Sequence, residues 1–127
     1  MYTFKRYIIV STIALAVVML SVIPVTSLPD AGGIFLDKMV HTVMYAGLTL
    51  AFCFDLTRNS NRRLTVKQFV GVFLFGVIFG LIIELLQSVI PYRSADFQDC
   101  LANAIGAFIG SCTGKYIFKP NKKVSPQ

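Results

Sequence analysis

Charged residues are scarce in this chain. Only 14% of its 127 residues are Asp, Glu, Lys or Arg, whereas a soluble domain carries about 25%. Hydrophobic residues make up 55% of the chain, and the mean hydropathy is +0.69. This deficit of charge argues against an ordinary soluble domain and indicates a membrane protein.

The chain also lacks the motifs of several common site classes. Its three cysteines, Cys53, Cys100 and Cys112, are too few and too scattered for a disulfide framework. No CxxC pair suggests a zinc site, and there is neither an HExxH sequence nor a nucleophile elbow. We therefore interpret the cysteines as small apolar packing residues, and we assign no metal ligands and no cofactor.

The alternation of polar and apolar residues that membrane barrel strands require is absent as well. Four long apolar runs are present instead, at residues 7–23, 35–54, 66–90 and 97–118. Each approaches the roughly 20 residues that an α-helix needs to cross a bilayer. The sequence therefore predicts an all-α fold, a four-helix transmembrane bundle forming a single membrane domain over 1–127, with a polar tail at 119–127.

The first apolar run also has the features of a signal peptide, because Lys5 and Arg6 precede it and the small residues of VTS follow it. The run from residue 7 to residue 23 is longer than the apolar region of about 7–15 residues in signal peptides. We expect an uncleaved helix, with cleavage as the alternative.

Acidic residues are nearly missing from one side of the predicted bundle. Ten of the twelve basic residues lie there: Lys5, Arg6, Arg58, Arg62, Arg63, Lys67, Lys115, Lys119, Lys122 and Lys123. Five of the six acidic residues lie at the other side: Asp30, Asp37, Glu84, Asp96 and Asp99. The positive-inside rule then predicts that both termini are cytoplasmic. The basic residues would lie near anionic lipid headgroups, so nucleic acid is not expected as a partner.

Polar residues share one face in each of the last three predicted helices. They repeat at intervals of three or four residues: Lys38 and His41, Glu84 and Gln87, and Asp99 and Asn103. His41, Glu84 and Asn103 each lie about 9 Å from the outer helix end at 1.5 Å per residue. A charged group in hydrocarbon costs about 2.5–3.5 kcal/mol. We therefore expect a shared pocket that opens outward, with Arg93 and Asp96 covering its mouth.

Several of these residues also have purely structural interpretations. Asp96 can be the N-cap of the last helix, with Asp99 near the position of a capping-box acid. Lys38 can extend its ammonium outward, and His41 can be a satisfied interior histidine. Arg93 can pair with Asp96 and only close the turn.

Glu84 is the hardest to explain by structure alone. A carboxyl group a full turn or more inside the bilayer needs a partner or must be protonated. The candidate partners in the sequence are His41, Arg93 and Lys38.

Two GxxxG pairs lie on consecutive predicted helices, Gly76 with Gly80 and Gly106 with Gly110. Small residues four positions apart let helix backbones approach closely in lipid, although glycine is common in membrane helices in general. The two pairs favour close packing of these helices. The short connections likewise predict that neighbours along the chain pack antiparallel.

The segments DKMVHTVMYAGL and IIELLQSVIPYRSADFQDCLANAIGAFIG resemble the VanZ-like family of bacterial membrane proteins, over about residues 7–118. The motifs are K-x-x-H (Lys38, His41), E-x-x-Q (Glu84, Gln87), R-x-x-D-x-x-D (Arg93, Asp96, Asp99) and N-x-x-G (Asn103, Gly106). The resemblance implies a multi-pass protein of the bacterial inner or plasma membrane. The family's namesake is linked to low-level resistance to teicoplanin, a glycopeptide that acts at the cell surface. The resemblance implies no catalytic residues.

Two functions are compatible with these features. In the first, the protein binds a membrane lipid or a lipid-linked cell-wall precursor, and thereby affects glycopeptide susceptibility. Lys38 and Arg93 would hold an anionic headgroup, while Glu84, Gln87 and Asn103 supply hydrogen bonds. His41, Asp96 and Asp99 complete the candidate binding residues.

In the second function, the protein is an enzyme at the outer membrane face. His41, Glu84, Asp96 and Asp99 would act as acid–base groups on a lipid headgroup or hold a divalent metal. The candidate catalytic residues are His41, Glu84 and Asp99. A transporter is a weaker third hypothesis, since four short helices form a small path unless the protein is a homo-oligomer.

Overall fold

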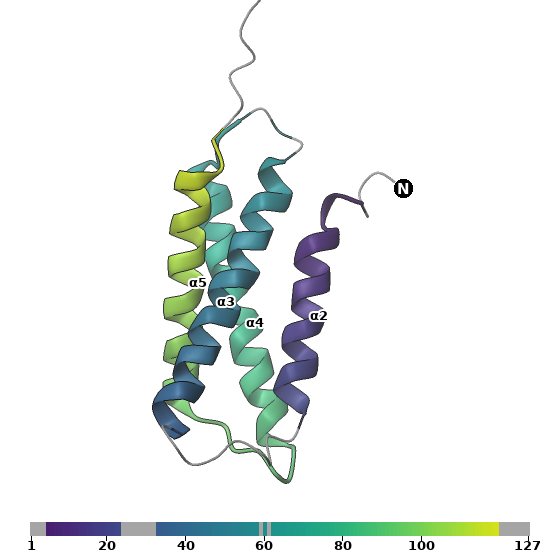
Figure 1. Ribbon diagram of the computed structural model, residues 1–127, viewed down its shortest axis with the longest axis vertical. Helices are drawn as coiled ribbons and strands as arrows, with labels where there is room; N and C mark the ends of the chain where they lie inside the picture. Colours follow the sequence, from purple (N-terminus) through teal and green to yellow (C-terminus); the bar gives the residue numbers. More distant parts are fainter. Residues whose placement is uncertain (1–4, 24–32, 59, 61, 120–127) are drawn as a thin grey trace, which may run out of the picture.

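The structure is a computed structural model that describes residues 5–23, 33–58, 60 and 62–119. Four helices run along the long axis of the molecule (Figure 1): α2 (Ile8–Val22), α3 (Gly33–Thr57), α4 (Val66–Ser88) and α5 (Phe97–Ile117). The described residues form no strand, so the prediction of an all-α four-helix bundle is confirmed. Part of the expected first outer loop, with Asp30, and of the polar tail, with Lys122 and Lys123, lies outside the described residues.

Helix boundaries follow local capping chemistry. Thr65 and Gln68 form a capping box at the start of α4, where each side chain binds the backbone N–H of the other residue. Asp96 is the N-cap of α5, because its Oδ1 accepts from the Gln98 N–H at 2.9 Å.

Two observed helices differ in length from the predicted apolar runs. The helix α3 runs from residue 33 to residue 57 and is longer than the expected range 35–54. The helix α4 ends at Ser88 and is shorter than the expected range 66–90.

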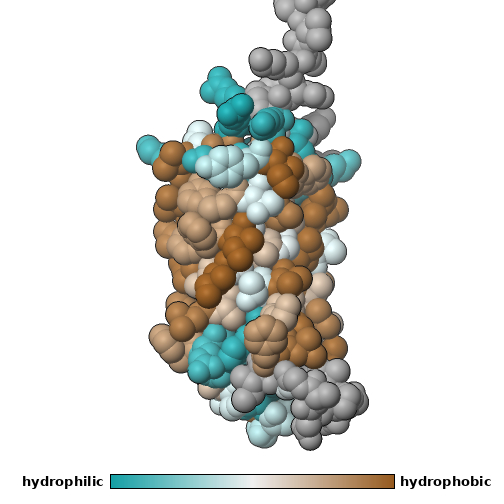
Figure 2. Space-filling view, turned by 60° about the vertical axis from the view of Figure 1, so that its left-hand side comes forward, coloured by the Kyte–Doolittle hydropathy of each residue, from teal (hydrophilic) through white to brown (hydrophobic). Residues whose placement is uncertain are grey.

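The surface is compatible with a membrane environment. Two helices are long and apolar enough to cross a bilayer, over Phe35–Thr57 and Val66–Ser88. Within the described residues, the expectation of four such helices is met for these two only, because α2 has 15 residues and α5 carries several polar ones. Figure 2 shows apolar side chains over the middle of the bundle and hydrophilic side chains near both ends.

The most extensive helix contact joins α3 and α5, which are not consecutive in the chain. Both helices run in the same direction, away from the end where α2 and α4 finish (Figure 1). Neighbouring helices do run antiparallel as expected, but the tightest packing is this parallel pair. Three glycines of α5 explain why the two backbones approach so closely: Gly106, Gly110 and Gly114.

Each glycine of this stripe leaves room for a part of α3. A Cβ at Gly106 would collide with the Thr42 carbonyl, and one at Gly110 would collide with the Ala46 carbonyl. The expectation of close packing through Gly106 and Gly110 holds, but the partner is α3 rather than α4. A periodic pattern identifies the face of a helix but not the neighbour that the face meets.

The two glycines of α4 lie at a junction of three helices. A Cβ at Gly76 would lie 2.7 Å from Ala107 Cβ on α5 and 2.8 Å from Thr49 Cγ2 on α3. A Cβ at Gly80 would lie 3.0 Å from Asn103 Cβ. These two glycines therefore set the spacing between α3, α4 and α5 close to the polar residues Glu84 and Asn103.

Candidate functional site

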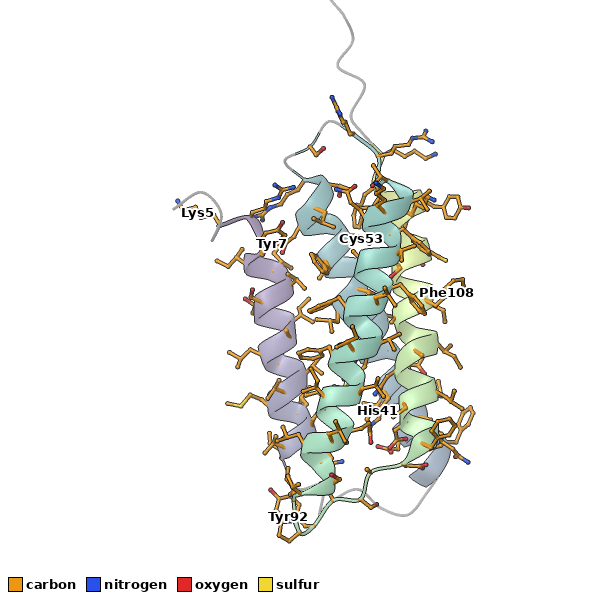
Figure 3. All side chains as sticks on the ribbon, turned by 180° about the vertical axis from the view of Figure 1, so that it is seen from behind. Lys5, Tyr7, His41, Cys53, Tyr92 and Phe108 are labelled. Carbon is orange, nitrogen blue, oxygen red and sulfur yellow. The ribbon has the colours of Figure 1, made fainter. Side chains whose placement is uncertain are left out.

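Polar side chains from three helices meet at the end of the bundle where α3 and α5 begin and α4 ends. We call this group the polar cluster: Asp37, Lys38, His41, Glu84, Asp96, Asp99 and Asn103. Figure 3 shows His41 toward this end, which it shares with Tyr92, whereas Lys5 and Tyr7 lie at the opposite end. We call the two ends the cluster end and the basic end.

Lys38 connects α3 to the start of α5. Its Nζ lies 3.1 Å from Asp96 Oδ2 and 3.0 Å from Asp99 Oδ1. Asp96 is thus the expected helix cap, and it also forms an ion pair with Lys38. The Gln98 N–H, and then the Lys38 ammonium, hold the pKa of the Asp96 carboxyl below its usual value.

His41 and Asn103 form the most deeply buried contact of the cluster. Their side chains are 6% and 1% exposed, and His41 Nδ1 lies 3.0 Å from Asn103 Oδ1. The neutral imidazole that fits this contact has its hydrogen on Nδ1, because the Asn103 amide oxygen only accepts. The lone pair of His41 is then on Nε2, which lies 3.9 Å from Asp37 Oδ1.

Glu84 reaches the cluster from α4. Its side chain is 4% exposed, and its Oε2 accepts from the Asp96 N–H at 3.3 Å. Its Oε1 has no hydrogen-bond partner among the described residues, and neither has Nδ2 of Asn103. The three partners expected from the sequence, His41, Arg93 and Lys38, make no hydrogen bond or ion pair with Glu84 within the described part of the chain. Buried polar atoms without partners are rare in native proteins, so this pair of atoms needs an explanation.

Two expected site residues face α2 instead of the cluster. Gln87 Nε2 donates to the Ser21 carbonyl at 3.1 Å, and Arg93 Nη2 donates to the Ile23 carbonyl at 3.0 Å. These bonds satisfy carbonyls at the C-terminal end of α2, which helix geometry leaves without intrahelical partners. The expected placement of Arg93 beside Asp96 is not found among the described residues, and Lys38 takes that role.

The cluster contains more acid than base. Four carboxyl groups, those of Asp37, Glu84, Asp96 and Asp99, accompany the single ammonium of Lys38. Asp37 is the member that sequence reasoning did not select as a binding residue, although its i,i+4 spacing to His41 was an available signal. The excess of acceptors favours a ligand that brings hydrogen-bond donors or positive charge.

Comparison with known proteins agrees with the sequence motifs. The VanZ/LLP1 family matches residues 2–118, which confirms the resemblance to VanZ-like proteins. A protein of Schizosaccharomyces pombe described as uncharacterized is 38% identical over 72 residues, which are 55% of this chain and 41% of that protein. The chain therefore matches less than half of the length of this curated relative. No solved structure matches the chain.

Proposed function

The chain belongs to the VanZ/LLP1 family, and on this premise we propose that it is a multi-pass protein of the bacterial cell membrane that binds a lipid headgroup in its polar cluster. In this proposal all four helices cross the membrane, both termini are cytoplasmic, and the cluster end faces outward. The ligand is a membrane lipid or a lipid-linked wall precursor.

The observation that carries the proposal is that two of the buried side-chain atoms without a hydrogen-bond partner, Glu84 Oε1 on α4 and Asn103 Nδ2 on α5, belong to the polar cluster. Leaving such an atom unpaired costs roughly 1–3 kcal/mol. A ligand that supplies one donor and one acceptor would recover this free energy for both atoms. Lipid headgroups carry such groups, and the exposed apolar surface of the helices would place lipid beside the cluster.

The charges of the cluster narrow the chemistry of the headgroup. Lys38 is already paired with two carboxylates, and Arg93 is bonded to a carbonyl at the end of α2. An anionic headgroup held by Lys38 and Arg93 together is therefore disfavoured. A headgroup that offers hydroxyl or amine donors to Glu84 fits the excess of acceptors better.

His41 provides a specific readout of binding, because it is the single histidine of the chain. We expect its ring ¹⁵N signals to shift when the protein in phosphatidylcholine nanodiscs is given phosphatidylethanolamine or phosphatidylglycerol, whose headgroups carry amine or hydroxyl donors, and to shift less with undecaprenyl phosphate, whose headgroup carries neither. Glu84→Gln should abolish the shift. Ser88→Ala is the matched control, since its hydroxyl only bonds the Leu85 carbonyl of its own helix. Unchanged His41 signals with all three lipids would overturn the proposal.

Membrane topology is tested separately with two matched serine-to-cysteine variants in a chain without its native cysteines. Ser94 lies between α4 and α5 at the cluster end, and Ser60 lies between α3 and α4 at the basic end. A membrane-impermeant maleimide should label Ser94→Cys on intact cells and Ser60→Cys only after permeabilisation. The reverse pattern would contradict an outward-facing cluster.

We extend the proposal to glycopeptide susceptibility. Binding of a lipid-linked wall precursor at the outer face would change how much of it teicoplanin can reach. Expression in a susceptible bacterium should raise the minimal inhibitory concentration of teicoplanin, and Glu84→Gln should remove the increase. An increase that persists in Glu84→Gln would separate resistance from the cluster.

A second candidate function is an enzyme acting on a lipid-linked substrate, metal-assisted or by acid–base groups alone. It is favoured by the grouping of Asp37, His41 and Asp99, whose potential ligand atoms all lie within 4.8 Å of one another. If Glu84→Gln or Asp99→Asn retains lipid binding but loses turnover of that lipid, this candidate replaces simple binding. If the wild type turns over no envelope lipid, the binding function stands.

A further inference from the structure

We infer that Asp37, His41 and Asp99 form a binding site for a divalent transition-metal ion, of the class of Zn²⁺ or Mn²⁺. Each residue offers one ligand atom, and these atoms lie within 4.8 Å of one another. A mixed set of one imidazole and two carboxylates suits these ions. The site would hold its ion whether or not the polar cluster binds a lipid, so it goes beyond the proposed function.

The three ligand atoms would have to move only slightly closer together to surround an ion. Ligand atoms around a tetrahedral metal lie roughly 3.4 Å apart, given metal–ligand distances of about 2.1 Å. The Asp37 side chain is 51% exposed, so its carboxylate can turn inward without disturbing packed neighbours. His41 and Asp99 are buried and already fixed by bonds to Asn103 and Lys38.

The bond between His41 and Asn103 prepares the imidazole for a metal. Ligating histidines usually donate their second ring N–H to an oxygen, which fixes the tautomer and the orientation of the ring. Here Nδ1 faces Asn103 Oδ1 at 3.0 Å, so Nε2 keeps its lone pair. That lone pair and the Asp37 carboxylate, 3.9 Å apart, are both acceptors, and a cation between them would satisfy both.

A second observation comes from Glu84, whose open oxygen also supports the proposed function. Its unpartnered Oε1 belongs to a carboxyl group that is 4% exposed and is bonded to the backbone of Asp96. Asp96 shares the Lys38 ammonium with Asp99, one of the three proposed ligands. Glu84 thus places a buried carboxyl group with an open oxygen in the same cluster, and a divalent cation nearby would stabilise its ionised form.

Lys38 competes with the ion in this arrangement. Its ammonium lies 3.0 Å from Asp99 Oδ1, close to where a metal would sit. Removing this positive charge should therefore strengthen metal binding. A lysine that merely supports the fold would give the opposite result, because its loss would loosen the ligand set.

The experiment measures Mn²⁺ and Zn²⁺ binding to the purified full-length chain in detergent, without added lipid, by calorimetry. Mn²⁺ separates this site from the cysteines, which prefer softer ions. We expect one ion per chain and paramagnetic broadening of the His41 ring signals by Mn²⁺. Asp37→Asn should weaken binding at least about ten-fold, as loss of metal-site partners does. Lys38→Gln should bind more tightly than the wild type.

Ser88→Ala is the control, since the Ser88 hydroxyl bonds the Leu85 carbonyl of its own helix and Ser88 lies outside the polar cluster. It should bind within about two-fold of the wild type. The inference is overturned if the wild type binds no stoichiometric ion, or if Asp37→Asn binds as well as Ser88→Ala. It also fails if Lys38→Gln weakens binding while its circular dichroism and unfolding temperature are unchanged. Headgroup binding that persists with a chelator present would leave the proposed function standing without the metal.

Discussion

The two ends of the bundle each bury a carboxyl group, and they treat it differently. At the basic end, Asp55 is fully buried, its Oδ2 accepts from the Val10 N–H at 2.8 Å, and Arg58 Nε lies 3.7 Å from its Oδ1. At the cluster end, Glu84 is almost as buried, and its Oε1, like Asp55 Oδ1, has no hydrogen-bond partner among the described residues. The difference is the partner charge: Arg58 forms an ion pair with Asp55, whereas no cationic side chain in the described part of the chain forms one with Glu84.

This difference separates a structural acid from a candidate binding acid. Asp55 attaches α2 to α3, because it satisfies a backbone N–H in the first turn of α2. Gln87 and Arg93 hold the other end of α2 through its last carbonyls. The cluster, by contrast, is shared by α3, α4 and α5, with no member on α2. The comparison therefore predicts that substitutions at Asp55 affect folding, whereas substitutions at Glu84 affect binding.

The largest effect is expected from Asp55→Ala. The change leaves the Val10 N–H without its acceptor and Arg58 without its carboxylate, so the free energy of unfolding should fall by about 2–4 kcal/mol. Glu84→Gln should change it by less than about 1 kcal/mol, because the amide oxygen can still accept from the Asp96 N–H. Chemical unfolding in detergent, followed by circular dichroism, measures both. Equal losses of unfolding free energy in Asp55→Ala and Glu84→Gln would contradict the distinction between the two ends.

A smaller effect is expected from Gly106→Ala in the contact between α3 and α5. The added Cβ meets the Thr42 carbonyl, and overpacking of this kind costs about 1–3 kcal/mol. Gly47→Ala is the control on α3, since a Cβ there meets nothing within 4 Å. It should leave the protein as stable or raise its stability by about 0.5–1 kcal/mol. An unfolding free energy that is unchanged in Gly106→Ala would mean that the two helices are not so close.

The smallest effect concerns acid titration of Asp96. Its pKa is lower in the folded protein than in the unfolded chain, so its stabilising contribution is present above the unfolded value of about 3.9. That contribution is lost as the pH falls through the lower, folded pKa. Asp96→Asn keeps a capping side chain and removes this titration. We expect the unfolding temperature to fall when the pH is lowered from about 5 to about 3, a range that spans the unfolded pKa. The fall should be smaller for Asp96→Asn than for the wild type.

Much of the architecture was predictable, because long apolar runs identify helices directly. The intervals between Lys38 and His41, and between Asp99 and Asn103, correctly place these pairs on helix faces that meet. The same intervals place Gln87 beside Glu84, yet Gln87 bonds to α2. Residues at helical spacing share a broad face, and that face can contact two different neighbours. Which neighbour each side chain meets depends on the parallel packing of α3 and α5, which no single-helix pattern contains.

The most direct test of the account is to identify the lipid that stays bound to the purified protein, using native mass spectrometry of the wild type and Glu84→Gln. We predict that the wild type retains one lipid per chain and that Glu84→Gln loses it while keeping its unfolding temperature. The account is contradicted if both proteins retain the same lipids in the same amounts, or if Glu84→Gln unfolds as readily as Asp55→Ala.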